Sequence, residues 1–126
     1  MTGLEPFEYA LIRVVPRVER GEAMNAGVIL YSQRHSYLGC RIRLDENRLR
    51  ALDSSVDLPA VVAALNALDT ECRRAVPGGE SPASPGARFR WLTATRSTMV
   101  QPGPVHSGLT ADPAAELEHL FDILVR

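Results

Sequence analysis

The segment from Phe7 to Val15 constrains the fold of this chain more than any other stretch. It reads Phe-Glu-Tyr-Ala-Leu-Ile-Arg-Val-Val, and β-branched and aromatic residues of this kind favour strands. Apolar residues occupy both alternating positions, so each face of the strand needs a covering layer. The segment therefore predicts a central strand of a sheet, and Pro16 either ends this strand or makes a bulge in it.

Two more strands are expected in the residues that follow. Residues 26–31 read Ala-Gly-Val-Ile-Leu-Tyr, which indicates a second buried strand, and residues 32–36 have the length of a hairpin turn. Residues 37–44 alternate between an apolar set and a set that holds Arg41 and Arg43. This alternation is typical of a half-buried strand with a wet, basic face. The first forty-odd residues therefore predict a three-stranded antiparallel meander.

Capping residues predict three helices. Asp45 is suited to cap a short helix that runs to Leu52. Asp57, with Pro59 two residues later inside the first turn, opens a main helix over about residues 57–76, along which apolar residues recur at helical spacing. Asp112, followed directly by a proline, opens a second main helix over about residues 112–126.

The remaining segments complete the expected fold. Residues 77–86 hold three prolines and three glycines, which predicts a flexible loop, either a plain connection or a lid. We expect a fourth strand near residues 88–94, a short strand over residues 98–101 and a forced turn at the Pro-Gly-Pro sequence 102–104. The prediction is one α+β domain over residues 1–126, an antiparallel sheet of four to five strands packed by the two main helices.

Composition excludes several classes. The net charge of −1 argues against a protein that binds nucleic acid through overall charge. No apolar run approaches the roughly 20 residues that span a bilayer, and the N-terminus does not resemble a signal peptide, so a cytoplasmic location is expected. Cys40 and Cys72 lack CxxC spacing, which argues against a zinc site or a disulfide framework and for reduced thiols.

All 14 residues counted as Lys or Arg are arginines, and they are spread unevenly. Residues 13–50 carry a balance of +4, whereas residues 103–126 carry −3. Arginine grips carboxylates and phosphates with a planar fork of donors. The two oppositely charged regions are expected to pair with each other in the fold.

Polar residues in two segments form the candidate binding site. They are Arg13, Arg17, Arg20 and Asn25 in the first segment and Arg96, Ser97, Thr98, Gln101 and His106 in the second. If the fourth strand lies near the first, these side chains would form an anion pocket, with His106 as a weak candidate for a general acid or base. Alternatively, the arginines pair with nearby glutamates, Asn25 bonds to backbone in a turn, and His106 is buried against a carbonyl.

Recognisable reaction motifs are missing from the sequence. Neither Ser97 nor Ser107, the serines nearest His106, lies in a G-x-S-x-G elbow. The histidines and cysteines do not have metal-ligand spacing, and no dinucleotide fingerprint is present. We therefore predict no cofactor, no metal and no established catalytic residue.

Two motifs carry a resemblance to a known family. The first is Tyr9-Ala-Leu-Ile-Arg-Val-Val-Pro-Arg-Val-Glu-Arg-Gly-Glu-x-x-Asn-x-Gly-Val28, and the second is Phe89-x-Trp-Leu-x-x-x-Arg-Ser-Thr-x-x-Gln-Pro-x-Pro-Val-His-x-Gly-Leu109. Together they resemble a bacterial family known as domain of unknown function 3037 (DUF3037). The resemblance implies no established activity, but it suggests a neighbour of HipA-like kinases.

Two functions follow as hypotheses. The first is a non-catalytic binding or regulatory protein, whose partner is a HipA-like kinase or a second copy of the chain. The alternative is a protein or enzyme that handles phosphate or nucleic acid through the Arg/Ser/Thr/His pocket. Nucleic-acid binding would weaken steeply with added salt.

Overall fold

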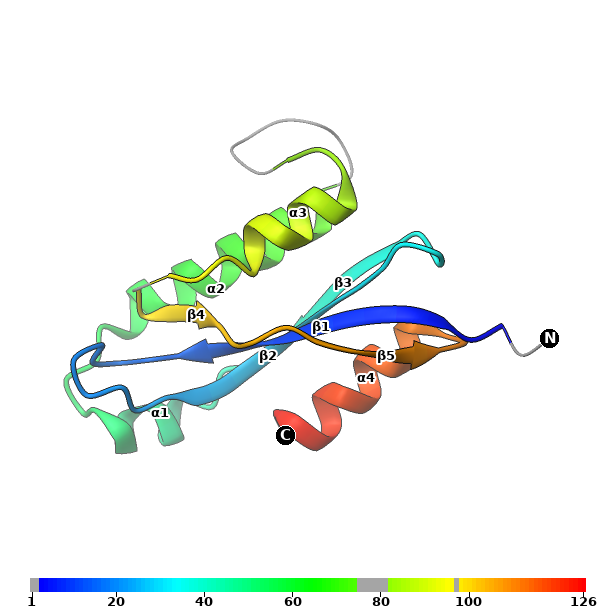
Figure 1. The fold of residues 1–126 in the computed structure, drawn as a ribbon. Helices are drawn as coiled ribbons and strands as arrows, with labels where there is room; N and C mark the ends of the chain where they lie inside the picture. The colour runs from blue at the N-terminus through cyan, green and yellow to red at the C-terminus, as the bar shows by residue number, and fades with distance from the viewer. Residues whose placement is uncertain (1–2, 75–81, 97) are drawn as a thin grey trace.

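The computed structural model describes residues 3–74, 82–96 and 98–126. In this part of the chain the strands are β1 (Glu5–Val14), β2 (Met24–Ser32), β3 (Tyr37–Ile42), β4 (Val100–Pro102) and β5 (His106–Thr110). The helices are α1 (Glu46–Leu52), α2 (Leu58–Arg73), α3 (Pro85–Leu92) and α4 (Pro113–Leu124). Figure 1 shows α2 and α3 above the sheet and α4 below it. The predicted α+β class is confirmed.

β1 lies at the centre of the sheet, as its two apolar faces predict. The strands run antiparallel in the order β3-β2-β1-β4, and β5 also pairs with β1. One edge of β1 faces β2, while the other faces β5 near its start and β4 near its end. The predicted meander is therefore confirmed as β1, β2 and β3, with a hairpin turn closed by a bond from the Ser36 amide to the Gln33 carbonyl.

β4 and β5 behave as one interrupted strand beside β1. Ile12 lies opposite Pro102 and Tyr9 lies opposite His106. Between these two pairs, β1 has two residues and the β4–β5 segment has three. Such an extra residue makes a bulge-like break in the ladder. The Gly103 amide still donates to a β1 carbonyl at 2.8 Å. The chain therefore keeps its direction through the Pro-Gly-Pro sequence, and the predicted turn there is wrong.

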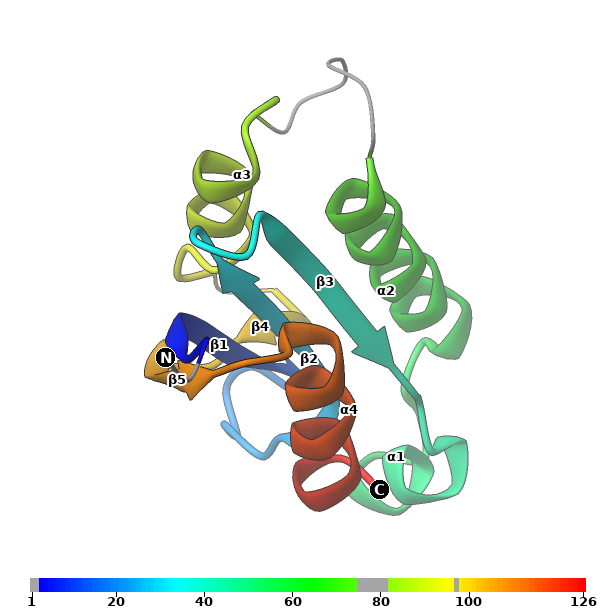
Figure 2. The same ribbon diagram turned by 90° about the vertical axis from the view of Figure 1, so that its right-hand side faces the viewer.

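Helices cover both faces of the sheet, as Figure 2 also shows. One apolar cluster joins β1 and β2 to α1, α2 and α3, and its largest buried side chains include Ile12, Ile29, Leu49 and Phe89. A second cluster on the opposite face joins β1 and β2 to α4 through Phe7, Leu30, Leu117 and Phe121. Because strand side chains alternate between faces, a sheet between two helical layers needs apolar residues at consecutive positions.

Three of the four helices begin where their capping residues predict. The carboxylates of Asp45, Asp57 and Asp112 each accept a hydrogen bond from a first-turn amide, all at 3.1 Å. Each of these bonds satisfies an amide that has no partner within the helix. The predicted main helices are α2 and α4, although α2 ends at Arg73.

Helix α3 replaces the strand expected near residues 88–94, and that expectation is wrong. Ser84 caps the helix by accepting a hydrogen bond from the Ala87 amide at 3.3 Å. The buried residues Arg88, Phe89 and Leu92 recur at helical spacing. A cap and a helical core face outweigh the strand preference of aromatic residues, which depends strongly on context.

The last two residues of the predicted proline- and glycine-rich loop, residues 77–86, belong to a helix. Pro85 and Gly86 form the first turn of α3, where proline is well tolerated because its missing amide is not needed. The prediction of irregular structure is therefore wrong for these two residues. Residues 77–81, which make up half of the predicted flexible loop, lie outside the described part of the chain.

The face of β3 expected to be wet and basic is partly covered by α4. The Arg41 guanidinium lies 2.9 Å from the Glu118 carboxylate and 4.9 Å from the centre of the Phe121 ring. Arg43 remains exposed. The Arg41–Glu118 pair joins the basic and acidic regions of the sequence, as expected from their opposite charges.

Candidate functional site

Arg13, Asn25 and Gln101 form one row across three strands. Arg13 on β1 lies opposite Asn25 on β2 and opposite Gln101 on β4. Residues directly opposite each other in a sheet point to the same face. The structure therefore brings together three of the nine predicted site residues, from both of the predicted segments.

Two members of this row are already hydrogen-bonded to backbone. Asn25 Nδ2 donates to the carbonyl of Leu124 at the end of α4, at 3.0 Å. Gln101 Nε2 donates to the Thr98 carbonyl at 2.7 Å. The sequence suggested that Asn25 bonds to backbone in a turn. Asn25 does bond to backbone, but the carbonyl it reaches lies at the end of a helix.

Arg13 differs from its two neighbours. It is half-buried, and its side chain makes no hydrogen bond or ion pair with the rest of the described chain. Its guanidinium packs against the backbone of Gly103, where an added Cβ would lie 3.2 Å from Cζ of Arg13. A larger residue at position 103 would require the guanidinium to shift by a few tenths of an ångström. The arginine keeps its donors available to solvent or to an anion.

His106 lies on the same face but is exposed. It sits opposite Tyr9, and the two rings are 5.3 Å apart between centroids. The alternative of a buried histidine bonded to a carbonyl is therefore wrong. Tyr9 and Arg13 are four residues apart on β1. Because His106 lies beside Tyr9, it is about 13 Å from Arg13 along the strand direction.

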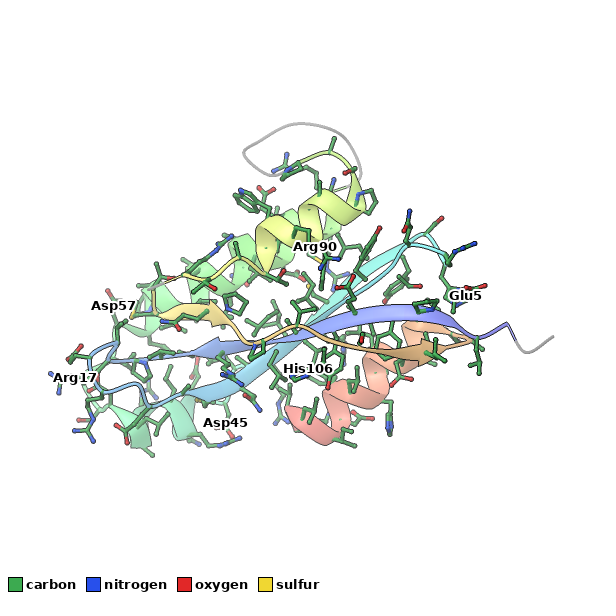
Figure 3. All side chains as sticks on the ribbon, in the orientation of Figure 1. Glu5, Arg17, Asp45, Asp57, Arg90 and His106 are labelled. Carbon is green, nitrogen blue, oxygen red and sulfur yellow. The ribbon has the colours of Figure 1, made fainter. Side chains whose placement is uncertain are left out.

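Arg17 and Arg20 lie in the β1–β2 connection, each beside a glutamate of the same connection. Arg17 Nε is 3.4 Å from Glu19, and Arg20 Nε is 2.5 Å from Glu22. The hydrogen bond to Arg20 lowers the pKa of the Glu22 carboxyl and raises the pKa of Arg20. In Figure 3, Arg17 lies at one end of the molecule and His106 lies near its middle.

Arg96 and Thr98 face a groove between α2 and the segment that follows α3. Arg96 Nη2 donates to the Trp91 carbonyl at 2.7 Å, and its Cζ lies 5.0 Å from the centre of the Trp91 ring. Thr98 Oγ1 donates to the Val100 carbonyl at 2.8 Å. Ser97, the predicted site residue between them, lies outside the described part of the chain.

The groove itself is apolar. It has a volume of about 340 Å³, and its walls are mostly aliphatic or aromatic. They are formed by Ala64, Ala67, Leu68, Trp91, Leu92, Met99, Val100 and Pro102, with Glu71, Arg96 and Thr98 as the polar members. Concave, mainly apolar surfaces with a few fixed polar groups are typical of binding sites.

A second hollow, of about 370 Å³, lies on the same side of the sheet near the start of β1. Arg90 of α3 donates through both terminal nitrogens to the Glu8 carboxylate, at 2.7 and 2.6 Å. This hydrogen bond to Glu8 raises the pKa of Arg90. Neither Arg90 nor Glu8 was among the residues predicted for the site, because the two lie 82 positions apart in the sequence.

Two kinds of feature are absent from the described residues. Across residues 3–74, 82–96 and 98–126, no three His, Cys, Asp or Glu side chains are grouped in a way that could hold a metal ion. None of the helices described is long and apolar enough to cross a membrane. Cys40 and Cys72 are buried free thiols, as expected.

The comparisons with known proteins agree with the two sequence motifs. The model of a family described as protein of unknown function, DUF3037, matches residues 9–125. This chain belongs to the DUF3037 family. No curated protein and no solved structure matches the chain.

The two DUF3037 motifs occupy adjacent places in the fold. The first runs along β1 into β2, and the second runs from α3 through β4 to β5. β4 and β5 both pair with β1, so the second motif lies against the first. The second DUF3037 motif therefore forms one edge of the sheet and one wall of the apolar groove, and the first motif forms the central strand beside that edge.

Proposed function

We propose that this protein is a non-catalytic binding protein that receives an apolar segment of a partner protein in the groove between α2 and Trp91–Pro102. The observation that carries the proposal is the apolar lining of this groove beside the Arg96 guanidinium, which is hydrogen-bonded to the Trp91 carbonyl. Binding energy at protein interfaces is concentrated where aromatic or aliphatic side chains fill such hollows. An amphipathic helix is the usual occupant of an apolar groove beside a helix.

The groove also favours a partner with an acidic flank. The Arg96 guanidinium lies over the Trp91 ring, and one of its terminal nitrogens donates to the Trp91 carbonyl. The remaining donors of its planar fork match a carboxylate of the partner. The DUF3037 resemblance suggests a HipA-like kinase as this partner, and the groove supplies the surface through which the two proteins would bind.

The direct test is co-expression with a HipA-like kinase encoded beside the gene, followed by size-exclusion chromatography. The expected result is a stoichiometric complex. In Ala67→Glu, a charge enters the groove from an exposed position of α2, and we expect affinity to fall at least about tenfold. Asn66→Glu adds the same charge at the adjacent exposed position, outside the groove, and should bind normally.

The outcomes separate the partner from the surface. If no complex forms with the kinase, the proposed partner is wrong. If a complex forms but Ala67→Glu and Asn66→Glu bind equally well, the groove is not the binding surface.

A second candidate function, anion binding, rests on Arg13. This half-buried guanidinium lacks a carboxylate partner in the described chain and stands between two side-chain amides. Titration with inorganic phosphate, followed by NMR of the arginine side chains, tests it. Phosphate should shift Arg13 signals in the native protein, and Arg13→Gln should abolish saturable binding while Arg34→Gln, at an exposed arginine in the turn between β2 and β3, retains it. Equal behaviour of the two variants would exclude an Arg13 site.

A further inference from the structure

The outer edge of β5 is open. β5 pairs with β1 alone in the described chain, and three of its five residues, His106, Ser107 and Leu109, are exposed. Leu109 is 62% exposed, and Val105 just before the strand is 40% exposed. An uncovered strand edge with apolar side chains is a ready template for pairing with another strand.

The direction of the backbone groups follows from the bonds of β1. The Pro6 carbonyl accepts a hydrogen bond from Ser32 of β2, so even-numbered residues at this end of β1 turn toward β2. The Leu11 carbonyl accepts from the Gly103 amide, so odd-numbered residues turn toward β4 and β5. In an antiparallel ladder the amide and carbonyl of one residue point to the same side.

The same alternation then applies to β5. Gly108 lies opposite Phe7, whose backbone faces β5, so the backbone groups of Gly108 are directed inward. Ser107 and Leu109 are the alternate residues, and their amides and carbonyls point away from the sheet. These groups form an unpaired hydrogen-bonding row at the sheet edge.

The sequence of β5 is complementary to itself. Two copies aligned antiparallel about Gly108 place Ser107 of each opposite Leu109 of the other, and the outward groups form about four hydrogen bonds. The bulky leucine then faces a small serine. Two glycines face each other at the axis, where the paired chains approach most closely. β5 contains no Asp, Glu, Lys or Arg, so no like charges meet across the interface.

We propose that a second copy of this chain occupies the β5 edge, joining two five-stranded sheets about a twofold axis through Gly108. Isologous pairing of this kind uses the same surface on both copies, so the assembly is complete as a dimer. The interface is short, so it belongs to the weak, transient class and not to the obligate dimers. It does not involve the apolar groove, and it is independent of the function proposed above.

Sedimentation velocity from about 10 µM to about 1 mM tests the pairing, because weak interfaces dissociate in this range. The expected result is a monomer–dimer equilibrium of the full chain. Hydrogen exchange should show the amides of Ser107 and Leu109 protected at high concentration and open at low concentration. Leu109→Lys should raise the dissociation constant at least about tenfold.

Ile123→Lys is the matched control. Ile123 is 59% exposed on α4, close to the 62% of Leu109, and the same charge there should leave the dimer intact. Ser107→Pro provides a second variant, because it removes an outward donor without removing a bond to β1. A monomer at every concentration, or a dimer that survives both β5 variants, would overturn the proposal. A dimer weakened equally by Ile123→Lys would overturn it as well.

Discussion

Arg88 Nη1 donates to the carbonyl of Arg74 at 2.7 Å, joining the end of α2 to α3. Arg88 is only 5% exposed. Its other two nitrogens donate to the carbonyls of Pro82 and Ala83 at 3.0 and 2.8 Å. The guanidinium thus binds backbone on both sides of residues 75–81, which makes it an anchor for the segment leading into α3.

Replacing Arg88 should therefore be costly. Arg88→Met keeps much of the side-chain volume but removes three charged hydrogen bonds from a buried site, and we expect a loss of about 2–4 kcal/mol in the free energy of unfolding. Urea denaturation monitored by circular dichroism measures it. Arg90→Met, which removes a largely exposed ion pair with Glu8, should cost less than about 1 kcal/mol. Equal losses in the two variants would contradict the anchoring role.

Asn25→Asp tests the bond between β2 and the end of α4. The introduced carboxylate has no donor for the Leu124 carbonyl, and it faces the negative end of the α4 dipole, so we expect a loss of about 1–3 kcal/mol near pH 7. Because the Arg13 guanidinium lies opposite residue 25 and would offset this repulsion, the substitution is made in an Arg13→Gln background, where the repulsion raises the pKa of the new carboxyl in the folded state. The penalty is therefore largest at neutral pH, and it shrinks as pH falls below the folded pKa, since the protonated acid can donate to the carbonyl.

The measurement is the difference in unfolding free energy between the Arg13→Gln/Asn25→Asp double variant and Arg13→Gln alone from about pH 7 to about pH 3, spanning the ordinary carboxyl range. Asn66→Asp, on the exposed side of α2, serves as the control and should show little difference. A penalty that is independent of pH would rule out the electrostatic explanation.

Gly27→Ala should destabilise the sheet more than Gly21→Ala. A Cβ at Gly27 would lie 2.6 Å from the Arg41 carbonyl oxygen, and backbone in a central strand cannot move away easily, so we expect at least about 2 kcal/mol. Gly21 has open space around it but a φ of +72°, and an alanine there costs about 1 kcal/mol in strain. Thermal unfolding compares the variants, and the reverse order would show that β2 and β3 can separate to admit the methyl group.

Cys40 should be unreactive in the folded protein. Hydrogen bonding with the Cys72 thiol, burial and the nearby Asp69 carboxylate raise the pKa of the Cys40 thiol well above its usual range. Its Sγ donates to Asp69 Oδ1 at 3.1 Å. Since the thiolate is the reactive form, labelling by a disulfide reagent at pH 8 should be roughly 100-fold slower in the native state than in urea. Rapid labelling of the native protein would show that the thiols are accessible.

The sequence by itself determined the elements whose signals are local. The apolar residues on both faces of Phe7–Val15 predicted a central strand, and the aspartates before α1, α2 and α4 predicted the helix starts. These signals are readable because strand alternation and helix capping depend on neighbouring residues alone. The two motifs also identified the family before any geometry was known.

Only the tertiary structure decided how the polar residues are grouped. The sequence suggested one pocket, but Arg13, Asn25 and Gln101 share a row across the sheet while Arg96 lies in a groove beside α2. Whether a guanidinium stays available or is engaged by Trp91 depends on partners brought together by folding. The helix at residues 85–92 was missed for a related reason: aromatic residues suit either a strand or a helix, and packing against β2 and α2 decides between them.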